Sequence, residues 1–253
     1  MLPFLKNHPF AVEAFFKSSL VLTFAVPKEE VTHLIPEPLR LDTFKDKWAF
    51  IAVAMVQTNN LRPKGFPRFL GNDFFLIGYR VFVRFTNKAG KNLRGLYILK
   101  SETDRRKMTF FGNIFTHYNY TTTDIRSIIE KDTLGFYSIK SGFELTVERG
   151  DAKNISLPNE SPFGEWSEAR RFAGPLPFTF TCNSADEKVL IIEGVRQNWK
   201  PAPVNVLNYS FPFLDNLELR GIRLANAFII DDIPYYWKKG KLETWKKEVS
   251  SGV

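Results

Sequence analysis

The stretch FFLIGYRVFVRFTNKAGKNLRGLYILKS, residues 74 to 101, carries the clearest local signal for a defined structure in this chain. Two apolar runs, Phe74–Phe85 and Leu93–Ser101, flank Asn87–Asn92, where Asn and Gly tolerate the positive φ of a tight turn. The pattern predicts a β-hairpin. Side chains alternate along a strand, so Arg80 and Arg84 should share one face of the first run. The opposite face is almost wholly apolar and should pack beneath a helix or a second sheet: Tyr79, Val81, Val83 and Phe85.

Similar short runs, separated by Gly, Pro and Asn, continue along the chain and predict mainly β structure. Further strands are expected at Ser18–Val26, Trp48–Gln57, Thr121–Ile129, Phe136–Ile139, Phe143–Glu148, Phe178–Cys182, Val189–Val195, Val204–Tyr209 and Ile222–Ile230. Helices are expected at Lys28–Ile35 and Ser161–Phe172, each with a proline at or near its start. We therefore predict an antiparallel β-barrel or β-cone with minor α content, in a few peripheral helices.

The composition is that of a globular protein. Of 253 residues, 44% are hydrophobic and 25% are charged, which excludes a disordered or fibrous chain. We place a single β-rich domain at residues 1–237. Residues 238–253 are rich in lysine and should form a solvated basic tail. One cysteine, Cys182, cannot form an internal disulfide, which fits a reducing compartment.

The positive net charge does not by itself indicate a nucleic-acid partner. The 35 Lys and Arg residues exceed the 27 Asp and Glu residues by 35 − 27 = 8. Lysines of the tail and the cations of a predicted turn, Arg105–Lys107, account for this excess. No helix-turn-helix, zinc-finger or RNP pattern is present, so we expect no nucleic-acid partner. The apolar stretch Ser18–Val26 is about half a bilayer span, so we also expect no membrane partner and a cytoplasmic location.

The sequence shows no recognisable metal or cofactor motif. The three histidines, His8, His33 and His117, lie far apart, and HExxH and CxxC are absent. The chain also lacks the GxSxG, GxGxxG and Walker A patterns of hydrolases, dinucleotide binders and nucleoside triphosphatases. We therefore expect neither a metal nor a cofactor.

Charged residues inside apolar strands point more directly to function, because a sheet interior tolerates them only with a partner or around a pocket. Arg80 lies in the first strand of the hairpin, and Glu193 lies in the apolar run IIEGV. We expect both to point into the barrel, either as a buried ion pair or as ligand-binding groups, since arginine can hold a carboxylate bidentately. Lys100 follows a long apolar run, and a strand-end lysine that reaches water is its simpler role.

Six segments match a known pattern in the same order: Val26–Phe44, Trp48–Val53, Leu61–Pro67, Tyr79–Val83, Gly95–Leu99 and Trp199–Val204. They resemble the YqjF-like conserved family of unknown function. That family is similar in fold to acetoacetate decarboxylase, whose β-cone encloses an apolar pocket and whose chemistry uses a Schiff-base lysine. The resemblance implies the same acetoacetate decarboxylase-like architecture that the strands predict.

The resemblance also identifies the position that corresponds to the lysine. The decarboxylase pattern is Gly-Arg-Glu-x-x-Gly-x-Pro-Lys, and residues 112 to 120 here read GNIFTHYNY. Tyr120 takes the place of the lysine, and Asn113 and Ile114 take the places of the Arg and Glu. A phenol with an ordinary pKa of about 10 cannot form an iminium, so we expect no Schiff-base chemistry.

These observations predict a protein that binds a small carbonyl- or carboxylate-bearing molecule. Arg80 would bind the anion. Tyr120 and Asn113 would hydrogen-bond a carbonyl, and Tyr97 and Trp199 would form walls of the site.

Two other functions stay open. One is a cofactor-independent lyase or hydratase-like enzyme, in which His117 or Glu193 is the general acid or base and Tyr120 polarises a carbonyl. Glu193 is in addition an expected ligand-binding residue. The other is a non-catalytic structural or oligomer module, and a homo-oligomer is compatible with each of these functions.

Overall fold

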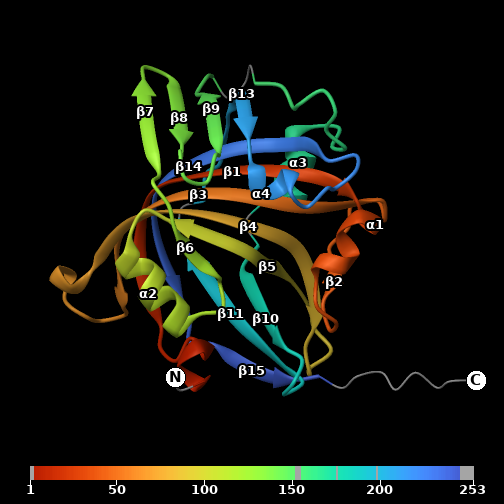
Figure 1. The fold of residues 1–253 in the computed structure, drawn as a ribbon. Helices are drawn as coiled ribbons and strands as arrows, with labels where there is room; N and C mark the ends of the chain where they lie inside the picture. The colour runs from red at the N-terminus through yellow and green to blue at the C-terminus, as the bar shows by residue number, and fades with distance from the viewer. Residues whose placement is uncertain (1–2, 152–154, 175, 198, 246–253) are drawn as a thin grey trace, which may run out of the picture.

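The computed structural model describes residues 3–151, 155–174, 176–197 and 199–245, and two β-sheets form most of it (Figure 1). The large sheet contains β1 (Val12–Pro27), β2 (Arg40–Leu41), β3 (Trp48–Pro63), β4 (Asn72–Thr86), β5 (Asn92–Thr103), β6 (Tyr120–Thr122), β10 (Phe178–Asn183), β11 (Lys188–Arg196), β12 (Ala202–Pro203), β14 (Arg223–Trp237) and β15 (Lys241–Thr244). The small sheet contains β7 (Arg126–Glu130), β8 (Thr133–Tyr137), β9 (Glu144–Glu148) and β13 (Asn205–Ser210). The predicted β-dominant class is confirmed.

Short helices lie around the sheets. They are α1 (Lys28–Val31), α2 (Arg106–Phe115), α3 (Trp166–Phe172) and α4 (Pro212–Asp215), with 3-10 turns η1 (Pro3–Asn7), η2 (Thr32–Leu34) and η3 (Arg68–Leu70). None of the helices in the described part of the chain has the length and apolar character needed to cross a membrane.

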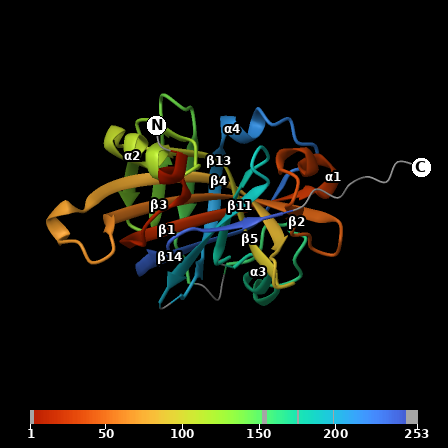
Figure 2. The ribbon, with the colours of Figure 1, turned by 90° about the horizontal axis from the view of Figure 1, so that it is seen from below.

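The large sheet closes on itself. Its strand order is β12-β14-β1-β3-β4-β5-β10-β11-β15, and β14 also pairs with β11. The closing contact is short and joins Gly194, Val195 and Arg196 to Trp237, Tyr236 and Tyr235. A closed ring is therefore formed by β14, β1, β3, β4, β5, β10 and β11, in this order. Figure 2 gives the view of these strands from below.

The predicted hairpin is formed by β4 and β5, two neighbouring strands in the wall of the ring. β4 and β5 pair from Thr86↔Asn92 to Leu76↔Thr103, with an irregularity after Tyr79. In the turn, the Asn87 side chain accepts hydrogen bonds from the backbone N–H groups of Ala89 and Lys91. The apolar face of β4 packs as predicted against the small sheet and belongs to the main hydrophobic core: Tyr79, Val81, Val83, Phe85, Leu134, Phe136, Leu145 and Val147.

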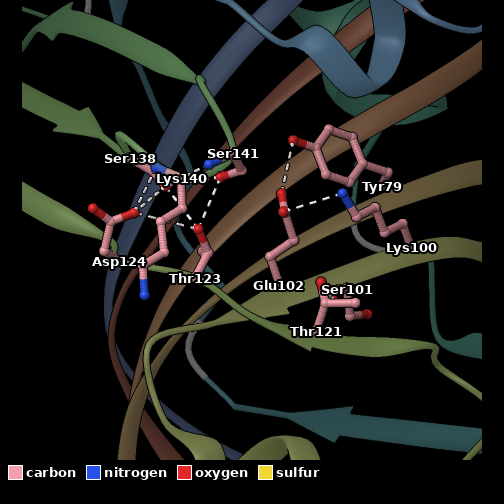
Figure 3. Close-up of polar contacts among 10 residues, drawn as sticks. All are labelled: Tyr79, Lys100, Ser101, Glu102, Thr121, Thr123, Asp124, Ser138, Lys140 and Ser141. Carbon is pink, nitrogen blue, oxygen red and sulfur yellow. Dashed lines mark hydrogen bonds and ion pairs between the residues drawn. The ribbon is translucent and has the colours of Figure 1, made fainter.

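A network of hydroxyls joins the small sheet to the end of β6 (Figure 3). The Thr123 hydroxyl lies 2.7 Å from the Ser138 hydroxyl. Asp124 accepts hydrogen bonds from the Ser138 hydroxyl, at 2.6 Å, and from the Lys140 N–H. These contacts connect two segments 15 residues apart in the chain. The network fixes the position of the small sheet over the large one.

Several local predictions are wrong. The sheet is not wholly antiparallel, because β6 and β10 each pair with β5 in parallel after a long crossover, as parallel neighbours require. The expected strand Thr121–Ile129 is split between the two sheets as β6 and β7. The expected turn at Arg105–Lys107 is instead the start of α2.

The helix expected at Ser161–Phe172 begins only at Trp166. The Ser161 hydroxyl accepts a hydrogen bond from the N–H of Phe163, so it closes a local turn instead of capping a helix.

The basic tail is also more ordered than expected. β15 pairs antiparallel with the edge of β11, from Lys188↔Thr244 to Ile191↔Lys241, and Trp245 and Glu243 are buried. An edge strand leaves backbone N–H and C=O groups unpaired, and β15 satisfies those of β11. The tail is therefore solvated only in part: Glu243 and Trp245 are buried, whereas the side chains of Lys238 and Lys241 stay largely exposed. Residues 246–253 lie outside the described residues.

A buried carboxylate links β2, β4 and β5. Asp42 is fully buried, and its two oxygens accept hydrogen bonds of 2.6 Å from Arg84 and Arg94. Asp42→Asn should lower the free energy of unfolding by about 3 kcal/mol, because it leaves two arginines without their counter-charge. Asp46→Asn removes the exposed ion pair to Lys28 and should cost below about 1 kcal/mol. Chemical denaturation of both variants checks this, and equal losses would contradict it.

Candidate functional site

A cavity of about 470 Å³ lies inside the ring, on the face of the large sheet opposite the small sheet. Alternate residues of two neighbouring strands line it: Ala52, Ala54, Val56 and Thr58 from β3, and Phe74, Leu76, Arg80 and Phe82 from β4. This alternation follows from strand geometry, since the intervening residues of β4 face the core. The volume is within the range of small-molecule sites.

The cavity is elongated along the strands. From Phe74 to Phe82 is eight residues, or about 26 Å at 3.3 Å per residue. The end of the cavity near Phe82 is closed by Ala173 and Leu176, and all three residues belong to one buried apolar cluster. At the outer end, the walls include the exposed side chains Leu70 and Phe111. Arg80 lies between these two apolar ends.

The charged residues that line the cavity are all cations. They are Arg62, Arg80, Lys107 and Arg196, and no Asp or Glu is among the described lining residues. The guanidinium of Arg62 forms an ion pair of 2.6 Å with the carboxylate of Glu13, and the side chain of Lys107 is exposed. Arg196 lies over the ring of Trp199, with its guanidinium carbon 4.7 Å from the ring centroid. The interior of the cavity is therefore positively charged.

Arg80 forms no ion pair with any Asp or Glu of the described chain. Its accessible surface belongs to the cavity wall, and its Nε atom is buried with no hydrogen-bond partner. Burial lowers the pKa of the guanidinium, while Tyr235, Tyr120 and Tyr118 raise it. Arginine nevertheless stays protonated in proteins. An uncompensated positive charge thus faces the cavity.

Three phenols surround this charge. Burial raises the pKa of Tyr118, Tyr120 and Tyr235, so all three remain neutral hydrogen-bond donors at physiological pH. The Tyr118 hydroxyl lies near Thr179 without reaching full hydrogen-bond geometry. Donors and a cation together form a site that suits an oxyanion.

Two glycines make room for two of these rings. A Cβ on Gly112 would overlap the Tyr120 ring, and a Cβ on Gly194 would overlap the Tyr235 hydroxyl. Asn113 fixes the backbone of Tyr120: its amide donates to the Tyr120 carbonyl and accepts from the Tyr120 N–H, each at 2.9 Å. The positions of the phenols are therefore set by their surroundings.

The predicted site residues divide into two groups. Arg80, Tyr120 and Trp199 line the cavity together. Four others are not among the lining residues: Tyr97, Asn113, His117 and Glu193.

Each of these four has another environment. Tyr97 is paired with Val81 in β4 and packs against the main core on the opposite face of the sheet. Asn113 binds the Tyr120 backbone and so positions that residue. His117 is half-buried, and its pKa is lowered by burial and by the charge of Lys6.

Glu193 neither pairs with Arg80 nor lines the cavity, so the expectation that it points into the barrel is wrong. Glu193 forms an ion pair of 2.9 Å with Lys238 and is partly exposed. Side-chain alternation does not show which face of a strand meets a cavity, and on β11 it is the face of Gly194 and Arg196. Since neither Glu193 nor His117 lines the cavity, their positions do not support the acid and base roles considered above.

Sequence reasoning missed many residues of the cavity, among them His8, Tyr118, Arg196 and Tyr235. Arg196 and Tyr235 are opposite each other across the closing contact of the ring. Only the pairing of β11 with β14 brings these two residues together at the cavity. Tyr118 lies two residues before Tyr120, but the backbone between them bends at residues 117 and 118 and is left-handed at Asn119, so strand alternation does not predict its position.

Lys100 does not reach the cavity. Its ammonium lies 3.1 Å from Glu102, which also accepts a hydrogen bond of 3.4 Å from the Tyr79 hydroxyl (Figure 3). The three side chains lie on the core face of β4 and β5, and Lys100 also lies over the ring of Phe213. Lys100 is thus a paired structural residue. Among the described residues, no three His, Cys, Asp or Glu side chains are grouped closely enough to hold a metal ion.

The fold is similar to that of acetoacetate decarboxylase and related proteins. A crystal structure of acetoacetate decarboxylase from Legionella pneumophila is similar, with a TM-score of 0.61, 10% identity, and coverage of 93% of this chain and 88% of that one. An acetoacetate decarboxylase-like enzyme from Sphingomonas wittichii RW1 is also similar, with a TM-score of 0.56, 10% identity, and coverage of 96% of this chain and 97% of that one. The enduracididine biosynthesis enzyme MppR, complexed with pyruvate, has a TM-score of 0.54 and 8% identity, and the match covers 92% of this chain and 90% of that one.

The chain belongs to the family DUF2071, described as an uncharacterized conserved protein, whose model matches residues 14–230. No curated protein matches the chain in sequence. Because the sequence identity to the solved structures is low, the comparison with them establishes the fold alone.

His8, at the cavity wall, makes the stability depend on pH. Burial lowers its pKa from 6.5 to about 4, partly offset by hydrogen bonds to the backbone of Lys238. The unfolded chain therefore takes up a proton more readily, and stability should fall by about 3 kcal/mol as the pH drops from 6.5 to 4. His8→Asn, which suits the left-handed backbone there, should remove this part of the pH dependence.

Urea denaturation at several pH values between 7 and 4 measures the effect. His33→Asn, at an exposed position, is the matched control and should leave the pH dependence unchanged. Identical pH profiles for the wild type and His8→Asn would show that His8 has no such role.

Proposed function

We propose that the protein binds a small amphipathic carboxylate inside the ring, with the carboxylate on Arg80. The main support for this proposal is that the guanidinium of Arg80 faces a cavity with no acidic residue among its described lining residues. A charge held in a protein interior without a counter-charge is costly, and a bound carboxylate would compensate it.

The surroundings of Arg80 favour this ligand further. Tyr118, Tyr120 and Tyr235 are neutral donors near the same charge. The indole N–H of Trp199 is buried without a hydrogen-bond partner and lines the cavity, so it offers a further donor. Apolar side chains line the cavity on both sides of Arg80, which suits a ligand with a hydrocarbon part.

The comparison with MppR supports a carboxylate ligand in this fold. That enzyme has been crystallised with pyruvate, a small carboxylate that also carries a carbonyl. In the present chain the lysine position of the decarboxylase pattern is Tyr120, and Lys107 at the exposed rim is the one described lysine that lines the cavity. We therefore infer binding without an iminium intermediate.

Arg80→Met should separate binding from stability. It should weaken carboxylate binding about 10- to 100-fold, the value of charge-assisted hydrogen bonds. It should leave the stability of the free protein unchanged or raised, because it removes an uncompensated charge. Arg84→Met, on the same strand, should instead lower stability, because Arg84 is the partner of buried Asp42.

Binding is measured with octanoate and, as a matched neutral probe, 1-octanol, by calorimetry and by the shift of the thermal midpoint. Octanoate should bind and stabilise the wild type more than octanol does, and Arg80→Met should abolish this preference. Equal responses to acid and alcohol, or an Arg80→Met variant that keeps the preference, would refute the proposal.

The absence of Schiff-base chemistry is tested separately. The protein incubated with acetoacetate and sodium borohydride should show no reduced adduct on any lysine by mass spectrometry, and it should not release carbon dioxide from acetoacetate. A stable lysine adduct would overturn this part of the proposal. An acetoacetate decarboxylase treated in parallel provides the positive control.

A further inference from the structure

Two segments at the outer end of the cavity expose aromatic side chains. The first is the tip of the β3–β4 hairpin, which contains η3 and projects from the body of the protein in both views (Figures 1 and 2). The second is α2. Their exposed apolar residues, called here the aromatic rim, are Phe66, Phe69, Leu70, Phe110 and Phe111. Leu70 and Phe111 also line the cavity, so the two segments border one opening.

The exposure is large for such residues. Phe69 is 83% exposed and Phe110 is 62% exposed, so neither ring contributes much to the hydrophobic core. Single exposed apolar residues are common, but a group of large ones at one place indicates a binding surface.

Cations accompany the aromatic rim. Residues 61–72 contain Arg62, Lys64 and Arg68, and residues 105–117 contain Arg105, Arg106 and Lys107. Neither segment contains an Asp or Glu. Arg62 is paired with Glu13, Arg105 lies 3.5 Å from Asp104, and Lys64 lies over the Tyr236 ring. For Arg68, Arg106 and Lys107 no acidic partner is present among the described residues.

The geometry points to an anionic lipid bilayer as the partner of this surface. Aromatic side chains insert at the boundary between headgroups and acyl chains, and nearby Lys and Arg residues are attracted to anionic lipids. The surface combines both features, and its most exposed ring is at the tip of a projecting hairpin. The cavity would then open toward the bilayer.

The shape favours lipid over other partners. Single-stranded nucleic acid is bound along grooves whose walls carry the aromatic rings. In this protein the β3–β4 hairpin, whose turn η3 contains Phe69, projects from the body of the molecule (Figure 1). A stable dimer needs about 800 Å² per partner of complementary surface, and a narrow tip offers little flat area. The expectation of no membrane partner rested on the lack of a spanning segment, which a surface-bound protein does not need.

The test is flotation of the full-length protein with vesicles of phosphatidylcholine, with and without phosphatidylserine. The protein should bind the vesicles that contain phosphatidylserine and bind less at high salt. Phe69→Ser with Phe110→Ser should reduce binding about tenfold or more. Arg68→Glu with Arg106→Glu should reduce it at least about fivefold for each charge.

Matched controls are available on the small sheet. Ile129→Ser with Ile139→Ser alters two residues that are 69% and 72% exposed, and Arg126→Glu with Lys131→Glu alters two exposed cations. Both control variants should bind vesicles as the wild type does. Circular dichroism and the thermal midpoint verify that every variant is folded.

Other outcomes would overturn the proposal. No binding to either vesicle, or an equal loss in the control variants, would do so. If vesicles are not bound but Phe69→Ser with Phe110→Ser abolishes a dimer in sedimentation velocity, the surface is an interface between two copies. If a fluorescent single-stranded oligonucleotide binds and vesicles do not, its partner is a nucleic acid. The test does not depend on the cavity ligand.

Discussion

Strand β4 is enclosed on both faces, and the alternation of its side chains determines what each face of the ring contains. Tyr79, Val81 and Val83 complete the core beneath the small sheet, while the residues between them face the cavity. A shift of one residue in the register of β4 would place Arg80 in the apolar core and Tyr79 in the cavity. The pairing of β4 with β3 and β5 therefore maintains both the core and the candidate site.

The cavity is built from parts that are distant in the sequence. Arg80 comes from β4, Tyr120 from the start of β6, and Tyr235 from β14. No single segment holds enough of these groups to bind an anion, so the site exists only when the ring is closed. The apolar walls keep competing water away from the charged centre, which strengthens electrostatic contacts there. The same walls are the reason for proposing an amphipathic acid as the ligand instead of a small hydrophilic one.

Much of the fold could be predicted from periodicity, and part of the site could be. The β4–β5 hairpin and the position of Arg80 on the face of β4 opposite the apolar core follow from turn residues and strand alternation, which are local properties. Helix α2 could not be found in this way, because it has no side-chain cap and no acidic residue in its first turn. Glu193 was misplaced because the inward face of β11 depends on its pairing with β14, a contact between distant segments.

Closure of the ring also constrains the order of events during synthesis. β1 pairs along its length with β14, and partners such as Leu22 and Ala227 are more than 200 residues apart. One edge of β1 therefore stays unpaired until β14 has been made. Pairings of such long range are formed slowly, and unpaired edges favour aggregation. While a nascent chain still lacks β14, we expect it to depend on chaperones, even though the finished ring is held by continuous strand pairing.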